Sequence, residues 1–317
     1  MRLWLFALTL TFSTFAVVVV IASGFVSWLA PAASRRLERH SPASRAAMLF
    51  RLRMLPAALA AVIAAGITLP IYLAYEPRDS DEALARTLML LGVAGASLMI
   101  RSGSRVIAAW RATRRVRREW QGRGRRIEGF DTTLPLFAID EPFPTVAVIG
   151  VSRPALFISE RVLGACTREE VGAMLRHEAA HVTVKDNLKR FLIRACPDLL
   201  RRGSELDRAW ARAAEEAADA AAVAHLPSSA VALAEALIRV ARLAPPRNTP
   251  ELASAFYLGG SIESRVRRLV SPHPAPQAPT PFGSVMLIGG TLCLAAAVLA
   301  AAPALHQGME LLVSRLP

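Results

Sequence analysis

Residues 174–187, MLRHEAAHVTVKDN, contain the pattern HExxH, formed by His177, Glu178 and His181. On a helix, two residues four positions apart project from the same face, so both imidazoles can reach one metal ion. Glu178 lies one step around the helix, where it can reach a water molecule beside that ion. Such a pattern also arises by chance in alanine-rich helices, so its interpretation depends on a third ligand and a suitable architecture.

A candidate third ligand lies in the segment RAAEEAADAAAV, on a separate expected helix. Glu215 in this segment would complete a shell of two histidines and one glutamate that leaves a fourth position open for water, as in catalytic Zn²⁺ sites. Asp219, one turn further on, is placed to accept a hydrogen bond from the second ring nitrogen of a ligating histidine. Glu216 is the fallback ligand. The alternative is that these carboxylates form the solvated face of an amphipathic helix.

The composition of the chain indicates a membrane protein. Of its 317 residues 53% are hydrophobic, yet the net charge is +13, so apolar and basic residues must be segregated. Each of four apolar stretches approaches or exceeds the ~20 residues that cross a bilayer as a helix. The stretches are residues 3–30, 54–75, 86–106 and 283–303. A cleaved signal peptide is the alternative for the first, and buried soluble helices are the alternative for the second and third.

Most of the positive charge lies beside these stretches. Residues 31–53 carry a net charge of +5 and residues 101–126 one of +9, so the rest of the chain is near neutral. This distribution argues against a nucleic-acid surface and follows the positive-inside rule for cytoplasmic loops. The loop YEPRDSDEALAR, with four acidic residues, fits the outside. We therefore expect both termini outside the cytoplasm and residues 107–282 inside it.

The expected fold is mostly α, with four transmembrane helices and a cytoplasmic α+β, zincin-like domain. Its parts are residues 1–106 with three spans, residues 107–282 with the metal site, and residues 283–317 with the fourth span and a short tail. Within residues 132–160, TVAVIGV and PALFIS predict a hairpin or small sheet. Its edge either pairs with an extended peptide beside the metal or only covers the helices.

Helices are expected to follow this sheet. Thr167 and Glu170 form a capping box that starts a helix, which continues to Pro197 either unbroken or with a bend near residues 185–187. A second helix is expected to begin after Ser204, with Asp207 completing another capping box, and to end near Ala224. Two further helices are expected at residues 228–242 and 261–270. Residues 111–128 form either a basic helix on the anionic membrane surface or a solvated linker.

The remaining histidines and the cysteines suggest no second site. We expect His40, His225, His273 and His306 to be surface or packing residues, since none has a partner pattern. The three cysteines are an odd number without framework spacing, so we expect free thiols in a reducing compartment. They are Cys166, Cys196 and Cys293.

The segments PFPTVAVIGVSRPALFIS and REEVGAMLRHEAAHVTVKDNLKRFL, followed by EEAADAAAV, are together similar to the BlaR/MecR-type membrane metallopeptidases of bacteria. The resemblance covers nearly the whole chain. It implies three spans, a cytoplasmic zinc domain and a fourth span in the inner membrane. It also implies His177, His181 and Glu215 as zinc ligands and Glu178 as the general base. We expect a member without the penicillin-binding domain that antibiotic-sensing relatives carry after the fourth span, so direct β-lactam sensing is not expected.

The leading hypothesis is a regulatory zinc endopeptidase that cuts a cytoplasmic protein such as a transcriptional repressor. One alternative is a protease of membrane-protein quality control resembling the Ste24/HtpX group, which shares HExxH and ExxAD. Another is a non-catalytic signalling scaffold stabilised by zinc, but a structural site would not need Glu178. Arg265 or Arg267 is the candidate oxyanion group, with lipid contact or surface solvation as the alternative. We expect the bilayer and a protein substrate as partners and no direct contact with nucleic acid.

Overall fold

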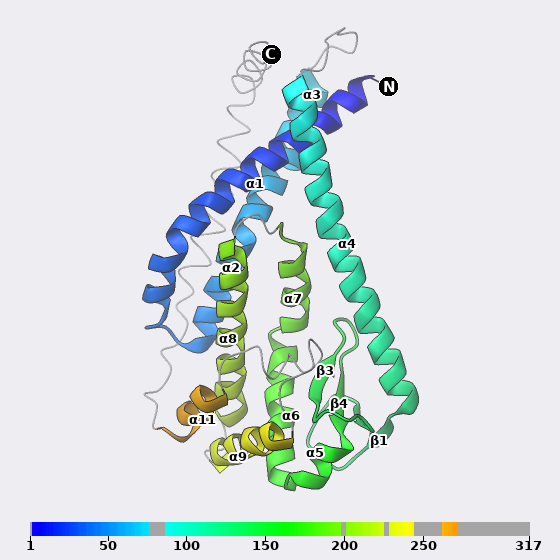
Figure 1. The fold of residues 1–317 in the computed structure, drawn as a ribbon, viewed down its shortest axis with the longest axis vertical. Helices are drawn as coiled ribbons and strands as arrows, with labels where there is room; N and C mark the ends of the chain where they lie inside the picture. Colours follow the sequence, from blue (N-terminus) through cyan, green and yellow to red (C-terminus); the bar gives the residue numbers. More distant parts are fainter. Residues whose placement is uncertain (1, 76–85, 198–200, 225–227, 244–261, 272–317) are drawn as a thin grey trace.

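The computed structural model describes residues 2–75, 86–197, 201–224, 228–243 and 262–271, which are mostly helical and include one small sheet (Figure 1). The helices are α1 (Arg2–Leu37), α2 (Pro42–Ile63), the π-helix η1 (Ala64–Thr68), α3 (Leu69–Tyr75), α4 (Arg86–Arg123), α5 (Glu160–Ala165), α6 (Arg168–Thr183), α7 (Asp186–Ala195), α8 (Arg201–Val223), α9 (Ser228–Leu243) and α11 (Ile262–Val270). The strands are β1 (Arg125–Ile127), β2 (Leu136–Ile139), β3 (Val146–Ile149) and β4 (Ala155–Ser159).

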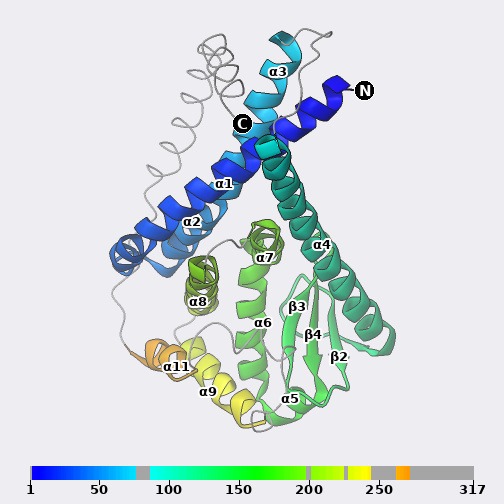
Figure 2. The ribbon, with the colours of Figure 1, turned by 45° about the horizontal axis from the view of Figure 1, so that its top comes forward.

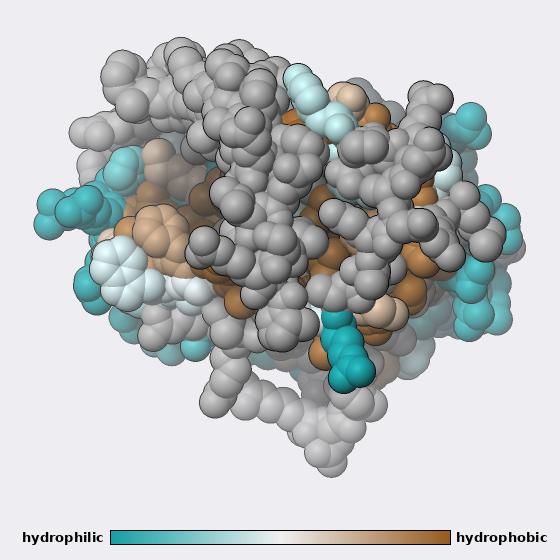
Figure 3. Space-filling view, turned by 90° about the horizontal axis from the view of Figure 1, so that it is seen from above, coloured by the Kyte–Doolittle hydropathy of each residue, from teal (hydrophilic) through white to brown (hydrophobic). Residues whose placement is uncertain are grey.

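Three helical segments are long and apolar enough to cross a membrane, namely Leu3–Leu37, Pro42–Tyr75 and Arg86–Arg123. They match the first three predicted spans, and the fourth, at residues 283–303, lies outside the described residues. The three segments expose large apolar side chains such as Trp28 and Leu90, as lipid-facing helices do. Figure 3 views the molecule from the end at which α3 lies, with brown hydrophobic side chains near the middle and teal hydrophilic ones towards the rim.

The crossing of α1 and α4 depends on small residues. Gly92 and Gly95 of α4 lie against the backbone of Thr9 and Phe12, and a Cβ atom at Gly95 would overlap the Phe12 carbonyl. Nearby, Ser13 Oγ donates a hydrogen bond to the Leu88 carbonyl at 2.9 Å. Small residues of this kind let helix backbones approach closely inside a membrane.

Helix α4 continues without a break beyond the predicted third span. Its 38 residues correspond to about 57 Å at 1.5 Å per residue, well beyond the ~30 Å of a hydrocarbon core. The basic segment after residue 110 is therefore helical as far as Arg123, and the linker interpretation is wrong for that part. This extension carries the chain to the sheet, which begins with β1 (Figure 1).

The sheet has the strand order β1-β2-β4-β3, with β2 and β4 parallel and both outer pairs antiparallel. The hairpin predicted from TVAVIGV and PALFIS is confirmed, since Val146 pairs with Ile158 and Ile149 with Ala155. Every residue of β4 is buried, whereas β3 forms one edge of the sheet. Apolar residues of β4, α6 and α9 form the core that fixes the HExxH helix against the sheet.

Helix α6 begins as predicted. The Thr167 side chain accepts from the Glu170 amide at 3.3 Å, and the Glu170 carboxylate accepts from the Thr167 amide at 2.7 Å. Lys185, in a left-handed conformation with φ of 57°, separates α6 from α7, so the bend expected at residues 185–187 is confirmed. Helix α7 ends at Ala195, two residues before Pro197.

Helix α8 begins at Arg201, so the predicted start after Ser204 is wrong. The expected second capping box does not form, because Asp207 lies inside the helix and accepts a hydrogen bond from Arg53 Nε of α2 at 2.6 Å. Phe50 and Trp210 also make a ring contact between α2 and α8. Figures 1 and 2 show α8 beside α2, and α6 between α8 and β3. Helix α8 is therefore packed directly on α2, which belongs to one of the three segments long and apolar enough to cross a membrane.

Candidate metal centre

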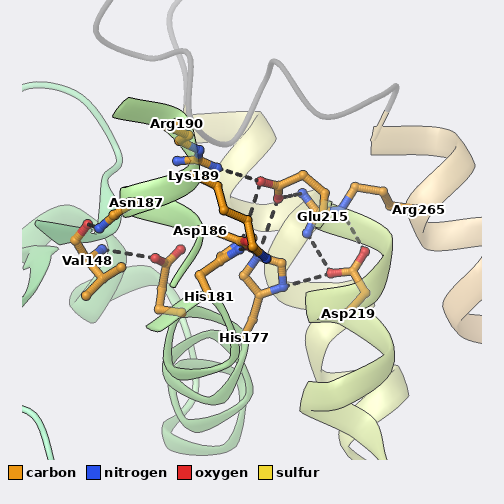
Figure 4. Close-up of polar contacts among 11 residues, drawn as sticks. Val148, His177, His181, Asp186, Asn187, Lys189, Arg190, Glu215, Asp219 and Arg265 are labelled. Atoms are coloured by element: carbon orange, nitrogen blue, oxygen red, sulfur yellow. Dashed lines mark hydrogen bonds and ion pairs between the residues drawn. The ribbon is translucent and has the colours of Figure 1, made fainter. Parts of the chain in front are cut away.

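Three side chains from two helices converge in the interior (Figure 4). His177 and His181 come from α6 and Glu215 from α8, and each has an exposed fraction of 5% or less. The two Nε2 atoms lie 3.2 Å apart. Glu215 Oε2 lies 3.4 Å from His177 Nε2, and Glu215 Oε1 lies 3.5 Å from His181 Nε2. Within the described part of the chain, this trio is the group of donors close enough to hold a metal ion.

The donor set is of a kind that zinc binds in proteins. Two imidazole nitrogens and one carboxylate form the protein shell of many catalytic zinc sites. Bonds of about 2.0–2.1 Å in a tetrahedron place neighbouring donors roughly 3.3–3.4 Å apart. The two Nε2 atoms, 3.2 Å apart, are close to that value, and each lies 3.4–3.5 Å from a different oxygen of Glu215, so the three residues could hold one metal ion.

The other ring nitrogen of each histidine faces a buried carboxylate. Asp219 Oδ1 lies 2.9 Å from His177 Nδ1, and Asp186 Oδ2 lies 2.8 Å from His181 Nδ1. A carboxylate in this position holds the Nδ1 proton, directs Nε2 towards the ion and makes the imidazole a stronger ligand. Asp186 is in turn bonded to Lys189 Nζ at 2.8 Å.

Two arginines balance the negative charge of the site. Arg265 of α11 donates to both oxygens of Asp219, at 2.8 and 2.6 Å, and its Nη1 lies 3.3 Å from Glu215 Oε2. Arg190 of α7 approaches the other Glu215 oxygen at 3.4 Å. Figure 4 shows Arg265 and Arg190 on different sides of Glu215. Arg265 therefore contacts two buried carboxylates and is itself buried, so the alternative of lipid contact or surface solvation is wrong for it, while its oxyanion role stays a prediction.

These contacts set the protonation of the metal-free site. Burial alone would lower the pKa of His177, but hydrogen bonds and charges from Asp219 and Glu215 outweigh it and raise that pKa to about 9. Burial would raise the pKa of Glu215, but His177, His181 and Arg265 lower it to about 2. Burial would also raise the pKa of Asp219, but Arg265 and His177 stabilise the ionised form and hold that pKa well below its usual range.

Glu178 turns towards the sheet. Its Oε2 accepts a hydrogen bond from the Val148 amide of β3 at 3.0 Å, and the side chain is buried. Asn187 Nδ2 donates to the carbonyls of Val148 and Gly150, both at 3.1 Å. The HExxH glutamate thus contacts the edge strand, and in the chain it directly follows His177 of the cluster.

The remaining candidates lie elsewhere. Glu216, the fallback ligand, forms ion pairs with Arg45 and Arg268 and does not join the cluster. Arg267 pairs with Glu263 on the surface. His40 is exposed, while the other three histidines predicted to have no special role lie outside the described residues. Cys166 and Cys196 form no disulfide, as expected, and Cys293 is outside the described residues.

Four residues of the site were given no role by sequence reasoning. They are Asp186, Asn187, Lys189 and Arg190. The sequence feature that could have pointed to them is VKDNLKR, which follows HExxH. The direction of each side chain, however, depends on the bend at Lys185. Comparison of the chain with models of protein families gives no match, and comparison with curated proteins gives none, so function has to be inferred from the site itself.

Proposed function

We propose that this protein is a membrane zinc endopeptidase that hydrolyses peptide bonds of a cytoplasmic protein, in regulatory signalling of the BlaR/MecR type. The observation that carries the proposal is the buried cluster of His177, His181 and Glu215 with Glu178 beside it. A structural zinc site is usually closed by four protein ligands, whereas three ligands leave room for a reacting group. The carboxylate partners on both histidines support a site built to hold an ion firmly.

The residues of the chain supply the proton transfer. When bound, zinc would act as a Lewis acid that polarises the scissile carbonyl and makes a water molecule more acidic. The Glu178 carboxylate would take a proton from the attacking water and then pass it to the amine that leaves when the C–N bond breaks. Asp219 and Asp186 hold the rings of His177 and His181 in orientation throughout.

The contacts of the basic segments support a cytoplasmic site. Arg45 pairs with Glu216 of α8, and Arg53 binds Asp207 of the same helix. Arg105 of α4 donates to the Cys196 carbonyl after α7 at 2.7 Å. The arginine-rich ends of the membrane helices and the metal cluster therefore belong to the same end of the molecule. Under the positive-inside rule, that end faces the cytoplasm of a bacterial inner membrane.

Replacing Glu178 with Gln tests the proposal. The full chain would be purified in detergent micelles, and cleavage of fluorescein-labelled casein would be followed alongside zinc content. We expect Glu178→Gln to keep the metal and to lose cleavage by at least ~100-fold, the lower range for loss of a general base. Turnover that persists in this variant would refute the catalytic role of Glu178, and an inactive wild-type chain with bound zinc would favour the scaffold.

A further inference from the structure

The outer edge of β3 presents backbone groups towards the site. In a strand, alternate residues direct their N–H and C=O groups to the same side. The Thr145 carbonyl accepts from the Ser159 amide at 2.8 Å, so residue 145 faces β4. Positions 146, 148 and 150 therefore direct their groups away from β4, to the edge that borders α6 and α7.

Side chains occupy this edge where a further strand would pair. The Val148 amide is bound by Glu178, and Asn187 donates to the Val148 and Gly150 carbonyls. Glu178 supplies a hydrogen-bond acceptor, and the Asn187 amide supplies a donor that serves two carbonyls. A neighbouring strand would supply the same kinds of group from its backbone. Figure 4 shows Asn187 reaching Val148 from α7.

The bend at Lys185 makes this arrangement possible. It brings Asp186 to His181 and the next residue, Asn187, to β3. One turn of α7 thus contacts both the metal cluster and the strand edge. Glu178 makes the same connection from α6, because it is adjacent to His177 and is bonded to Val148.

We propose that the outer edge of β3 is the docking strand for an extended segment of a substrate protein, and that Asn187 and Glu178 occupy this edge in the resting chain. This inference rests on the proposed function, since it places the peptide beside the metal cluster. An incoming backbone takes over the Val148 amide and both carbonyls, as in β-strand addition. Docking displaces Asn187 and releases the Glu178 oxygen that Val148 holds, so the base becomes available when a peptide is in place.

The competition has a measurable consequence. Each hydrogen bond that a peptide makes to the Val148 amide or to the Val148 and Gly150 carbonyls must replace one that the resting chain already has, so the net gain from these bonds is small. Removing the Asn187 amide leaves two carbonyls for the peptide to satisfy, so the variant binds substrate more tightly than the parent chain does.

The test measures docking separately from cleavage. The full-length Glu178→Gln chain in detergent micelles is mixed with casein, and amide hydrogen exchange is followed in residues 146–150. Saturating casein is expected to slow exchange in this segment. Adding Asn187→Ala to the same background is expected to lower the dissociation constant for casein by threefold to tenfold, with the zinc content unchanged.

Two further variants guard the interpretation. Asn187→Asp, which places a carboxylate against the two carbonyls, should tighten casein binding as well and serves if the alanine variant does not fold. Thr183→Ala is the matched control, because Thr183 Oγ1 donates to the Ala179 carbonyl within α6 and makes no bond to β3. Its dissociation constant should equal that of the Glu178→Gln parent.

The outcomes separate the two proposals. Casein that the wild-type chain cleaves, but that leaves exchange at residues 146–150 unchanged, overturns the docking strand and leaves the peptidase standing. Casein that stays intact yet slows exchange there supports the docking strand and overturns the peptidase. If casein is not cleaved and exchange at residues 146–150 is also unchanged, both proposals are overturned. Unchanged or weaker casein binding in both Asn187 variants overturns the competition by Asn187.

Discussion

Asp219 joins His177 to Arg265, because its carboxylate lies 2.9 Å from the Nδ1 atom of the histidine and accepts two hydrogen bonds from the guanidinium. The three residues come from α8, α6 and α11 and are all buried. The Asp219 carboxylate, on α8, therefore links α11 to the HExxH helix α6. Its ionised state is maintained by neighbours on both sides.

Replacing Asp219 with Asn should weaken zinc binding. The amide keeps the size of the side chain but removes the charge that orients His177 and pairs with Arg265. Loss of such a partner typically lowers metal affinity 10- to 100-fold. Competition with a chelator of known affinity measures the change, and Asp186→Asn should act similarly through His181. Wild-type affinity in both variants would show that the carboxylates do not support the ligands.

Replacing Arg265 with Met should destabilise the fold. The change removes the guanidinium that contacts both Asp219 and Glu215, and removing one partner of a buried ion pair costs about 3–5 kcal/mol. Thermal unfolding of the full chain in micelles should show a clearly lower midpoint. Arg267→Met is the matched control on the same helix, since its partner Glu263 is exposed, and should leave the midpoint nearly unchanged. Equal midpoints in the two variants would contradict this role for Arg265.

Zinc uptake should release a proton from His177. The pKa of this histidine in the metal-free chain is about 9, above its ordinary 6.5. The protonated ring therefore stabilises the metal-free fold fully below pH 6.5, and this contribution is lost as the pH rises through 9. A ligand must be neutral, so apparent zinc affinity should increase about tenfold per pH unit between about pH 7 and 9. Calorimetry in buffers of different ionisation enthalpy measures the release, and a heat independent of buffer would contradict it.

Replacing Gly95 with Ala should disturb the membrane helices. A Cβ atom there overlaps the Phe12 carbonyl of α1, and overpacking of this kind costs about 1–3 kcal/mol. Gly103 lies on the same helix, and a methyl group added there would meet nothing within 4 Å, so Gly103→Ala is the control. Thermal unfolding in micelles should show a lower midpoint for the first variant alone. Identical midpoints would argue against the close crossing of α1 and α4.

Features that depend on residues a few positions apart were predictable. The Thr167–Glu170 capping box follows from a spacing of three, and the shared face of His177 and His181 follows from a spacing of four. Glu215 came from the chemistry of a two-histidine site, which needs a further ligand on another element. The β3–β4 hairpin followed from two apolar runs around a turn.

Features that depend on tertiary contacts were not predictable from the sequence. Asp207 suggested a helix start, but its partner is Arg53, 154 positions away. Asp186 reaches His181 only because Lys185 adopts a left-handed conformation, which residues other than glycine and asparagine seldom signal. The bond between Glu178 and Val148 depends on how the sheet is placed against α6, and no local pattern encodes that placement.

The central claim is that His177, His181 and Glu215 hold one zinc ion. Its most direct test is the zinc content of the full chain purified in micelles, measured by inductively coupled plasma mass spectrometry for the wild type, Glu215→Ala and Glu216→Ala. We predict one zinc per chain in the wild type and in Glu216→Ala, whose side chain pairs with arginines, and a strong loss in Glu215→Ala. A wild-type chain without zinc, or a Glu215→Ala chain that retains it in full, would contradict the account.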